Sequence, residues 1–408
     1  MDADIVVIGA GALGLSSALH AALLGRSVVV VERQAAGSQA SGRAAGLFKS
    51  VQADELRTKL ACRSIDLAIS FPDWADAPLE VARSGSFLIA RTDQHKAYLQ
   101  REARQSRGWG VGVREAHQGE LADRLSYYHG DGHELALWCP QDVYIDQPLA
   151  LIDAYAAACR KHGVELLESE AVTAVTLSAG HVTGVETTRR PVTAPAVVDA
   201  AGAWARQVAE LAGGQLAVAP VRHQLLITEP SSDVDPADPI CRVVDAAVYL
   251  RPARGGLMVG GFEAAPLSAD PRAEAASFST DDVPVDLAVL RGMSGLVSAE
   301  VPAARATPAE CRGGLFTMTP DGRFVIGPVP DVPGLWVASG CNGSGFSSSL
   351  AIGEALADWI CTRPRRIDIT DLSPARFGAI TDDQLIKAGT WQYAHYYDPA
   401  ADGATPAA

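Results

Sequence analysis

Several features that would assign the chain to a specialised class are scarce or absent. Aromatic residues make up only 6% of the 408 residues, and no stretch reaches the roughly 18 consecutive apolar residues that a membrane-spanning helix needs. Basic residues do not dominate, because 34 lysines and arginines stand against 48 aspartates and glutamates, a formal charge of −14. Since binding to a polyanion needs clustered positive charge, nucleic acid and anionic membranes are both disfavoured as partners.

The cysteines give no sign of disulfide cross-links or of a metal site. The seven cysteines are odd in number and show no CxxC pairing, and the first strand pattern begins within a few residues of Met1, which leaves no room for a signal peptide. We therefore expect reduced thiols, a cytoplasmic protein and no metal site. The cysteines are Cys62, Cys139, Cys159, Cys241, Cys311, Cys341 and Cys361.

What the chain does have is a dinucleotide-binding pattern at its N-terminus. An apolar strand at 5–8 precedes Gly9, Gly11 and Gly14, a helical stretch follows, and a second strand ends at Glu32. In such a unit the three glycines permit a tight turn, close approach of the pyrophosphate and close packing of the helix, whose N-terminus stabilises phosphate charge. A carboxylate at Glu32 accepts hydrogen bonds from an adenosine ribose and argues against a 2′-phosphate.

Three later segments favour FAD over NAD. Residues 37–47 form a small, hydroxyl-rich loop that suits a long, flat cofactor, and residues 197–204 form a buried strand that ends in small residues. Residues 334–346 form a strand and a glycine turn that open a helix extending to about Trp359. The free N–H groups at the start of that helix can stabilise negative charge on a reduced isoalloxazine ring.

In order and spacing these segments resemble the D-amino-acid oxidase and glycine/sarcosine oxidase superfamily of FAD-dependent amine oxidoreductases. The resemblance rests on DIVVIGAGALG (4–14), the strand that ends at Glu32, ASGRAAG (40–46), VVDAAGAWA (197–205), TPDGRFVIGP (319–328) and ASGCNGSGFSSS (338–349). It implies an α/β fold: a Rossmann-like FAD-binding domain with a discontinuous substrate domain on a mostly antiparallel sheet. The residues expected to bind the cofactor are Gly9, Gly11, Ala12, Leu13, Gly14, Glu32, Arg33, Ser41, Arg43, Ala44, Ala45, Gly46, Leu47, Val172, Ala201, Gly202, Trp204, Gly343, Ser344, Gly345, Phe346 and Ser347.

Changes of pattern along the chain give the expected domains. The inserts that should build the substrate domain are rich in strand patterns, with one helix expected at 286–297, whereas the FAD-binding segments include helices expected at 53–71 and 148–162. The last ten residues are small and polar enough to be disordered. We expect a FAD-binding domain at 1–85, 141–222 and 320–372, a substrate domain at 86–140 and 223–319, a C-terminal aromatic segment at 373–398 and a disordered tail at 399–408.

The candidate catalytic residues are Tyr249, Arg251 and His223. A strand over 247–251 places Tyr249 and Arg251 on one face, and glycine oxidases carry a substrate-binding tyrosine on the equivalent strand. His223 begins the insert that should cover the flavin. Each residue also has a structural interpretation: Tyr249 as a core aromatic, Arg251 as a solvent-facing cation and His223 as a buried histidine whose hydrogen bonds are satisfied.

Two departures from the family concern the substrate carboxylate. Phe316 stands where glycine oxidases place a carboxylate-binding arginine, and Ser347 stands where monomeric sarcosine oxidases place a lysine. Both differences lead us to expect a bulkier N-substituent than in sarcosine or glycine. The candidates left to bind a carboxylate are Lys49, Arg43, Arg251 and Tyr249.

Two further departures concern the flavin. Gly314 and Arg43 occupy the positions at which covalent relatives link the flavin, while Cys311 is out of register, so we expect non-covalent FAD. Met258 replaces the lysine that activates oxygen in monomeric sarcosine oxidases, which leaves oxidase and dehydrogenase both open.

The sequence therefore predicts FAD-dependent oxidation of a secondary amino acid, an N-substituted glycine, to an imine that is hydrolysed, with O2 as acceptor and H2O2 as product. A dehydrogenase that uses a protein or quinone acceptor is one alternative, and a non-catalytic flavin-binding module is another. The aromatic cluster at 391–397 can line a pocket, cap a neighbouring molecule or lie on the surface. The sequence does not predict the oligomeric state.

Overall fold

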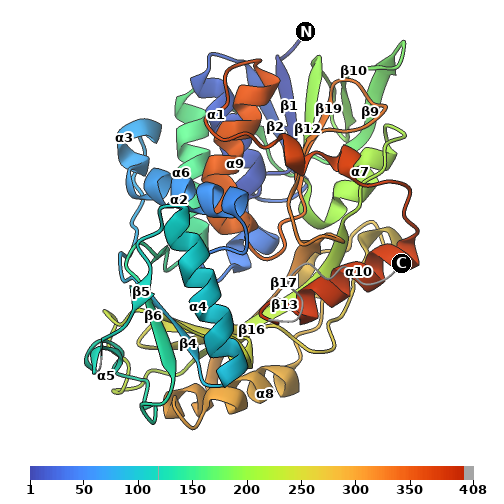
Figure 1. The fold of residues 1–408 in the computed structure, drawn as a ribbon. Coiled ribbons are helices and arrows are strands. Elements are labelled where there is room, and N and C mark those ends of the chain that lie inside the picture. Colours follow the sequence, from blue (N-terminus) through green and yellow to red (C-terminus); the bar gives the residue numbers. More distant parts are fainter. Residues whose placement is uncertain (118, 399–408) are drawn as a thin grey trace.

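Two large sheets organise the chain. The computed structural model describes residues 1–117 and 119–398, and the predicted disordered tail at 399–408 lies outside them (Figure 1). The first sheet has the order β18-β19-β12-β1-β2-β8 and is parallel except for the β18–β19 pair. Its strands are β1 (Ile5–Ile8), β2 (Val28–Val31), β8 (Glu165–Leu167), β12 (Ala196–Asp199), β18 (Val325–Pro328) and β19 (Leu335–Ser339).

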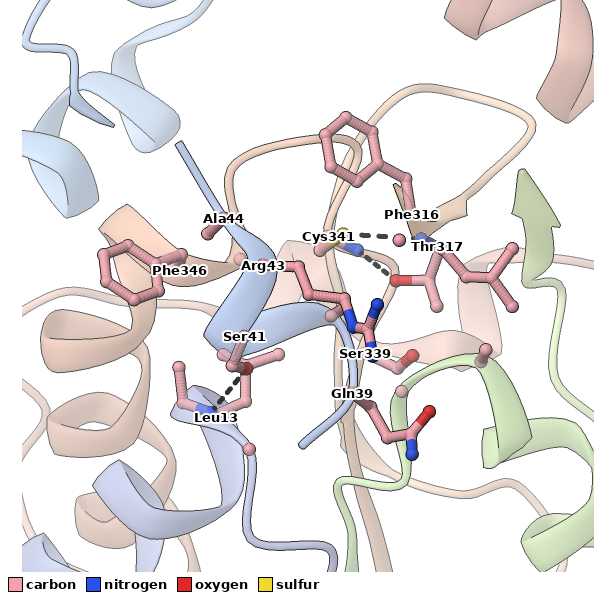
Figure 2. Close-up of a pocket in the computed structure, with 18 of the residues that line it drawn as sticks. Leu13, Gln39, Ser41, Arg43, Ala44, Phe316, Thr317, Ser339, Cys341 and Phe346 are labelled. Atoms are coloured by element: carbon pink, nitrogen blue, oxygen red, sulfur yellow. Dashed lines mark hydrogen bonds between the residues drawn. The ribbon is translucent and has the colours of Figure 1, made fainter. Parts of the chain in front are cut away.

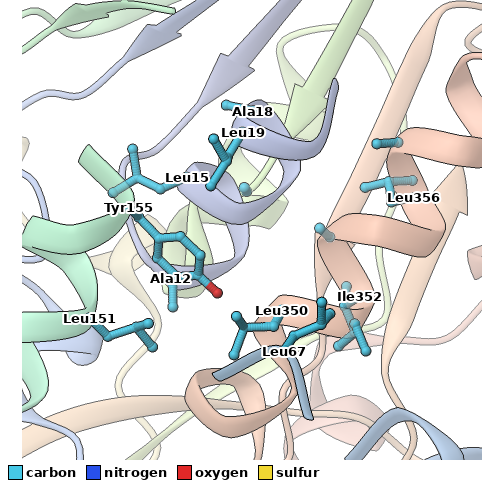
Figure 3. Packing of buried hydrophobic residues seen from close by; sticks show 14 of the residues in the cluster. Ala12, Leu15, Ala18, Leu19, Leu67, Leu151, Tyr155, Leu350, Ile352 and Leu356 are labelled. Atoms are coloured by element: carbon cyan, nitrogen blue, oxygen red, sulfur yellow. The ribbon is translucent and has the colours of Figure 1, made fainter. Parts of the chain in front are cut away.

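Helices pack closely on this sheet because small residues face one another. A Cβ on Gly353 of α9 would lie 2.2 Å from the Ser16 hydroxyl oxygen of α1, so the two helices can cross at this distance only with glycine there. Figure 3 shows the apolar core between them, where Leu15 and Leu19 lie near Leu350 and Tyr155. The helices are α1 (Ala12–Leu23), α2 (Glu55–Ile69), α3 (Phe71–Ala75), α6 (Pro148–Lys161), α7 (Ala205–Glu210) and α9 (Gly345–Ile360).

The second sheet is mostly antiparallel and has the order β17-β13-β16-β15-β14-β4-β6-β5, with β14 and β4 as a parallel pair. These two sheets confirm the predicted fold class; the exact domain boundaries remain predictions, and β13 already begins at Ala219. Its strands are β4 (Ser86–Ala90), β5 (Arg114–Glu115), β6 (Leu135–Cys139), β13 (Ala219–Thr228), β14 (Ile240–Val243), β15 (Val248–Ala253), β16 (Gly256–Gly261) and β17 (Pro308–Met318).

Helices α4 (Asp93–Gly108), α5 (Glu120–Arg124), α8 (Leu287–Val297) and α10 (Asp382–Ala394) accompany this sheet, and α10 packs across β13 and β17 (Figure 1). Sequence patterns did not predict α4 or α10. The remaining strands are β9 (Val172–Ser178), β10 (His181–Thr187) and β11 (Pro191–Thr193), which form one small sheet, and β3 (Leu47–Phe48) and β7 (Val143–Tyr144), which pair with each other. Among the described residues, no helix combines the length and apolar character that crossing a membrane requires.

Candidate functional site

A cavity of about 630 Å³ extends from the turn after β1 to the strands of the second sheet. Figure 2 shows part of its wall, where the 39–44 loop, the end of β17 and the start of α9 meet. Every residue predicted to contact the cofactor lines this cavity except Gly14. A Cβ on Gly14 would lie 1.9 Å from the carbonyl oxygen of Gly9, so Gly14 serves the close packing of α1 behind the turn.

The turn after β1 offers a backbone surface that only small residues permit. Gly9 has φ +103°, and a Cβ there would lie 2.7 Å from the carbonyl oxygen of Ala200. The hydroxyl of Ser41 accepts a hydrogen bond from the backbone N–H of Ala12 at 3.0 Å, which ties the 37–47 loop to the start of α1. A pyrophosphate fits this arrangement because it would meet a helix N-terminus and backbone rather than side chains.

Glu32 occupies the position of the ribose-binding acid. Its carboxylate accepts backbone N–H groups from Ala10 and Gln34, each at 2.9 Å, and it lines the cavity. Because an ionised carboxylate has about four acceptor positions, these two bonds leave capacity for ribose hydroxyls. Beside it, the Arg33 guanidinium lies 3.9 Å above the ring of Trp204, which forms a flat wall suited to an adenine ring.

The start of α9 supplies free donors at the other wall. Gly343 has φ +81°, and Ser344, Gly345 and Phe346 line the cavity where this helix begins. The first N–H groups of a helix have no partner within the helix, so this end can stabilise negative charge on a flavin ring. Together the glycine turn, Glu32 and this helix start make the cavity fit FAD.

At the far end of the cavity, His223 connects two tyrosines. Its Nε2 lies 2.9 Å from the hydroxyl of Tyr249, and its Nδ1 lies 2.8 Å from the hydroxyl of Tyr393 in α10. The imidazole stacks on Phe316, with ring centres 4.1 Å apart. Burial lowers the pKa of His223 to about 3, so the ring is neutral. The structure thus brings two of the three predicted catalytic residues together, and Tyr249 and His223 both line the cavity.

Arg251 is not among the residues that line the cavity. It shares a face with Tyr249, as the strand period predicted, but its side chain is fully buried and its donors are in use. It donates to the carbonyl oxygen of Ala45 at 3.0 Å and to the carboxylate of Asp146 at 2.8 Å. The interpretation as a solvent-facing cation is therefore wrong, and the contacts assign Arg251 to holding the 43–47 loop against the sheet.

Lys49 is half-buried, and it faces the cavity. Its ammonium nitrogen lies 5.5 Å and 5.4 Å from the ring centres of Tyr396 and Tyr397, and it makes no hydrogen bond or ion pair with any described residue. Burial opposes its charge, but attraction to the two tyrosines outweighs burial and raises the pKa of Lys49. The same cation lowers the pKa of Tyr396 although burial acts to raise it. Glu102 adds a smaller attraction, but Lys49 forms no ion pair with a carboxylate among the described residues.

Arg242 is a cavity residue that sequence reasoning missed. It lies opposite Tyr249 in the β14–β15 register, and its Nη1 donates to Ser86 and to Asp142, each at 3.0 Å. Its Nη2 is buried and has no hydrogen-bond partner among the described residues. The strand Ile240–Val243 resembles an apolar core strand in sequence, so only the pairing register with Tyr249 reveals that Arg242 faces the substrate end.

The C-terminal aromatic residues contribute to the same wall. Tyr396 and Tyr397 line the cavity, and Tyr396 stacks on Phe262 with ring centres 4.1 Å apart. The sequence left open whether residues 391–397 line a pocket, cap a neighbouring molecule or lie on the surface. Tyr396 and Tyr397 line a pocket. Trp391 instead stacks on His395.

Gly314 and Arg43, the positions at which covalent relatives link the flavin, both line the cavity. A Cβ on Gly314 would lie 3.7 Å from the Cα of Ala40, at the cavity wall, whereas Cys311 is half-buried and does not line the cavity. All seven cysteines are free thiols. Cys341 does line the cavity, and its sulfur accepts a hydrogen bond from the backbone N–H of Thr317 at 3.4 Å.

Comparisons with known proteins agree with this geometry. The family model for FAD dependent oxidoreductases, DAO, matches residues 4–359. The chain is 29% identical over 405 residues to mitochondrial dimethylglycine dehydrogenase of Mus musculus, a match that covers 95% of this chain but 45% of that protein. It is 28% identical over 386 residues to glycine oxidase of Pseudomonas aeruginosa, with 92% of this chain and 99% of that protein covered.

Among solved structures, L-proline dehydrogenase from P. horikoshii matches with a TM-score of 0.83 and 23% identity, over 92% of this chain and 98% of that chain. The chain thus spans less than half the length of the mitochondrial relative and nearly all of the glycine oxidase. The chain belongs to the DAO family of FAD-dependent oxidoreductases, and FAD is its cofactor.

Proposed function

We propose that the protein oxidises the C–N bond of an N-substituted glycine to an imine, which water hydrolyses, with O2 as the electron acceptor. The observation that carries this proposal is the pair of incompletely partnered cations, Lys49 and Arg242, beside Tyr249 at the end of the FAD cavity. Bound FAD would supply the chemistry by accepting a hydride equivalent, two electrons and one proton, from the carbon next to nitrogen, while the nitrogen loses a proton to give the imine.

The positive charges of Lys49 and Arg242 favour a substrate that carries an anionic group. Glu32 is the only acidic residue among the described residues that line the cavity, and it lies at the adenosine end. At the substrate end, Lys49 has no ion pair among the described residues, and the Nη2 amino group of Arg242 has no partner there although Nη1 binds Asp142. A buried charged donor without an acceptor is costly. A substrate carboxylate would supply the missing hydrogen-bond acceptor for both Lys49 and Arg242. The hydroxyl of Tyr249 adds a third donor.

The same surroundings favour a neutral amine. No described carboxylate lines this end of the cavity to bind an ammonium ion, and the walls include the rings of Phe262, Phe316 and Tyr396. His223 is neutral because burial lowers its pKa to about 3. An apolar wall with nearby cations disfavours a protonated amine, and a neutral amine is the form whose C–H bond can be oxidised. The residues therefore orient the substrate and exclude water rather than transfer a proton.

The name of one curated relative supports this substrate class, because dimethylglycine is an N-substituted glycine, whereas glycine oxidase is named for the unsubstituted amino acid. Phe316 and Ser347 stand where the family places small-substrate anchors, and Phe316 fills its position by stacking on His223. We therefore propose a substituent on nitrogen larger than one methyl group.

The test is anaerobic mixing of the purified flavoprotein with glycine, D-alanine, sarcosine and N-(carboxymethyl) amines of increasing size. Bleaching of the flavin by the N-substituted glycines, with the bulkiest preferred and NADH inactive, is expected. Equal turnover of glycine or D-alanine would refute the bulkier substrate, and no bleaching by any amino acid would indicate a non-catalytic flavin-binding module. Acid precipitation should release all the yellow colour as free FAD, and colour in the pellet would indicate a covalent link.

A dehydrogenase is the second candidate, and Met258 favours it. Met258 is fully buried in an apolar cluster with Leu225, Ile227 and Ala253, against Ala45 of the cofactor loop. A methionine there offers no charge to stabilise the anion that O2 forms on taking its first electron. Stoichiometric H2O2 in air would support the oxidase, whereas slow reoxidation by O2 and fast reoxidation by a quinone would support the dehydrogenase.

A further inference from the structure

A buried hydrogen-bonded chain runs from the C-terminal helix α10 to the substrate end of the cavity. It consists of Tyr393, His223 and Tyr249, joined at 2.8 Å and 2.9 Å. Tyr393 is fully buried and does not line the cavity, whereas the other two residues do. The ring of Tyr393 also packs near Phe262 and Phe316 of the cavity wall, but its hydroxyl can influence a bound substrate only through His223.

The neutral imidazole allows two arrangements of protons. A neutral histidine carries one N–H group, so it donates at one nitrogen and accepts at the other. If Nε2 carries the proton, His223 donates to Tyr249, Tyr393 donates to Nδ1, and the Tyr249 proton is free to point into the cavity. If Nδ1 carries the proton, Tyr249 must donate to His223, and its proton is no longer available to a substrate.

The surroundings of Tyr393 select between these arrangements. Tyr393 is fully buried away from the cavity, whereas Tyr249 lines the cavity. In the second arrangement the Tyr393 oxygen would accept the proton of His223 Nδ1, and the Tyr393 proton would need another acceptor. Within residues 1–117 and 119–398, His223 is the one hydrogen-bond acceptor found for Tyr393. A fully buried hydroxyl proton without an acceptor is costly, so the first arrangement is favoured.

We propose that Tyr393 is a positioning residue that fixes the Nε2–H tautomer of His223 and thereby makes Tyr249 a hydrogen-bond donor to the substrate carboxylate. The inference rests on the proposed function only for the identity of that anion. Lys49 and Arg242 flank the same space, so the carboxylate would meet two cations and one oriented hydroxyl. The C-terminal helix is in this way part of the binding site although only its neighbours Tyr396 and Tyr397 touch the cavity.

The first test observes the tautomer directly. Holoprotein with isotope-labelled histidine is studied by NMR, and His223→Gln identifies the signals of His223 among the nine histidines. The expected result is a protonated Nε2 and an unprotonated Nδ1 in the wild type. Protonation at Nδ1 would overturn the proposal. This readout does not depend on turnover, so it remains informative if the proposed reaction is wrong.

The second test measures binding of (methylthio)acetate, whose sulfur replaces the amine, by its effect on the flavin spectrum, with the neutral amide of the same acid for comparison. We expect about a tenfold loss of affinity for the acid in Tyr249→Phe and about threefold or more in Tyr393→Phe. Because the proposed effect of the Tyr393 hydroxyl passes through Tyr249, the double variant should bind like Tyr249→Phe, and multiplied losses would overturn the proposal.

Tyr127→Phe is the matched control for losing a buried hydroxyl. Tyr127 is fully buried, donates to the carbonyl oxygen of Pro239 at 3.0 Å and does not line the cavity. Tyr127→Phe should leave the affinity for (methylthio)acetate unchanged. Equal loss in Tyr127→Phe and Tyr393→Phe would show a general effect of destabilisation and would also overturn the positioning role.

Discussion

Replacing Lys49 by methionine should weaken substrate binding without weakening the fold. Lys49 has no ion pair among the described residues, and its charge faces the cavity beside Tyr396 and Tyr397. A hydrogen bond between charged groups contributes about 1.5–3 kcal/mol, so kcat/KM for a carboxylate-bearing amine should fall about 10- to 150-fold. Because attraction to the tyrosines offsets the cost of burying this charge, and methionine keeps most of the side-chain volume, the free energy of unfolding should change little.

Arg242→Met should differ from Lys49→Met because it should lose stability as well as affinity. Arg242 binds Asp142, whose side chain is fully buried, so removing the guanidinium leaves an uncompensated buried carboxylate. Breaking a buried ion pair costs about 3–5 kcal/mol, and this variant should lose stability as well as affinity. Lys59→Met, which changes an exposed lysine in a surface pair with Glu55, serves as the control and should change neither quantity much.

The assays are steady-state kinetics with the preferred amine, flavin-detected binding of (methylthio)acetate and its amide, and urea unfolding followed by fluorescence. Lys49→Met should lose affinity for the acid and not for the amide. Unchanged affinity for the acid would refute Lys49 as a carboxylate ligand. A large loss of stability in Lys49→Met would show that its charge has a structural partner after all.

Three further predictions follow from single residues. Tyr249→Phe should lower kcat/KM about tenfold or more, the effect of one hydrogen bond of at least about 1.5 kcal/mol, with FAD content unchanged; normal kinetics would exclude Tyr249 from the site. Glu32→Arg should strongly reduce flavin occupancy, because it removes both a ribose acceptor and the acceptor of the Ala10 N–H group; full occupancy after gel filtration would contradict this. Burial lowers the pKa of His20 to about 4 and that of His223 to about 3, so both stay neutral when folded but take up protons below about 6.5 when unfolded. Stability should therefore fall as pH decreases from about 6.5 toward 4, and His223→Gln should reduce that slope, by up to about 1.4 kcal/mol per pH unit; an unchanged slope in urea titrations would count against a buried neutral His223.

Local patterns made the cofactor end predictable. The first strand, the glycine turn and α1 lie next to one another in sequence, so the 5–8 strand and the glycine spacing were sufficient to place β1 and the start of α1. The same reasoning predicted β10 (His181–Thr187) with the bounds that the structure has. Side chains in these elements follow one period, and the residues that approach the cofactor are set by the turn itself.

The two long helices that sequence patterns missed differ in character, because α4 has few apolar residues and α10 has only a weak apolar period. Helix α4 is polar along most of its length, and α10 contains Gly389, whose position allows an approach to Ala219 of β13 so close that a Cβ would lie 2.9 Å from the Ala219 Cβ. A usable signal was nevertheless present. Thr381 and Gln384 form a capping box at the start of α10, and the spacing of threonine and glutamine is readable in the sequence.

The substrate end was harder to predict because its residues meet only through long-range packing. Arg242 faces the cavity because β14 pairs with β15 and with β4, and Tyr393 reaches His223 because α10 packs across β13. No local pattern contains either relation. The period of two predicted the face of Arg251 correctly, but not that the cofactor loop would cover it.

The residues that surround the substrate come from two parts of the chain. The family model matches residues 4–359, which include the glycine turn, Glu32 and most of α9, whereas α10 and the two cavity tyrosines Tyr396 and Tyr397 lie beyond it. The family-matched part therefore builds the cofactor site and most of the substrate end, including Tyr249 and Phe316, and the C-terminal tyrosines complete the wall of the space in which the N-substituent must fit. Since Tyr393 orients His223 and Tyr396 stacks on Phe262, a change in the C-terminal helix would alter the wall and the hydrogen-bond donors together. We therefore expect the choice of amine to depend on residues 382–397 together with Phe316 and Ser347 of the family-matched part.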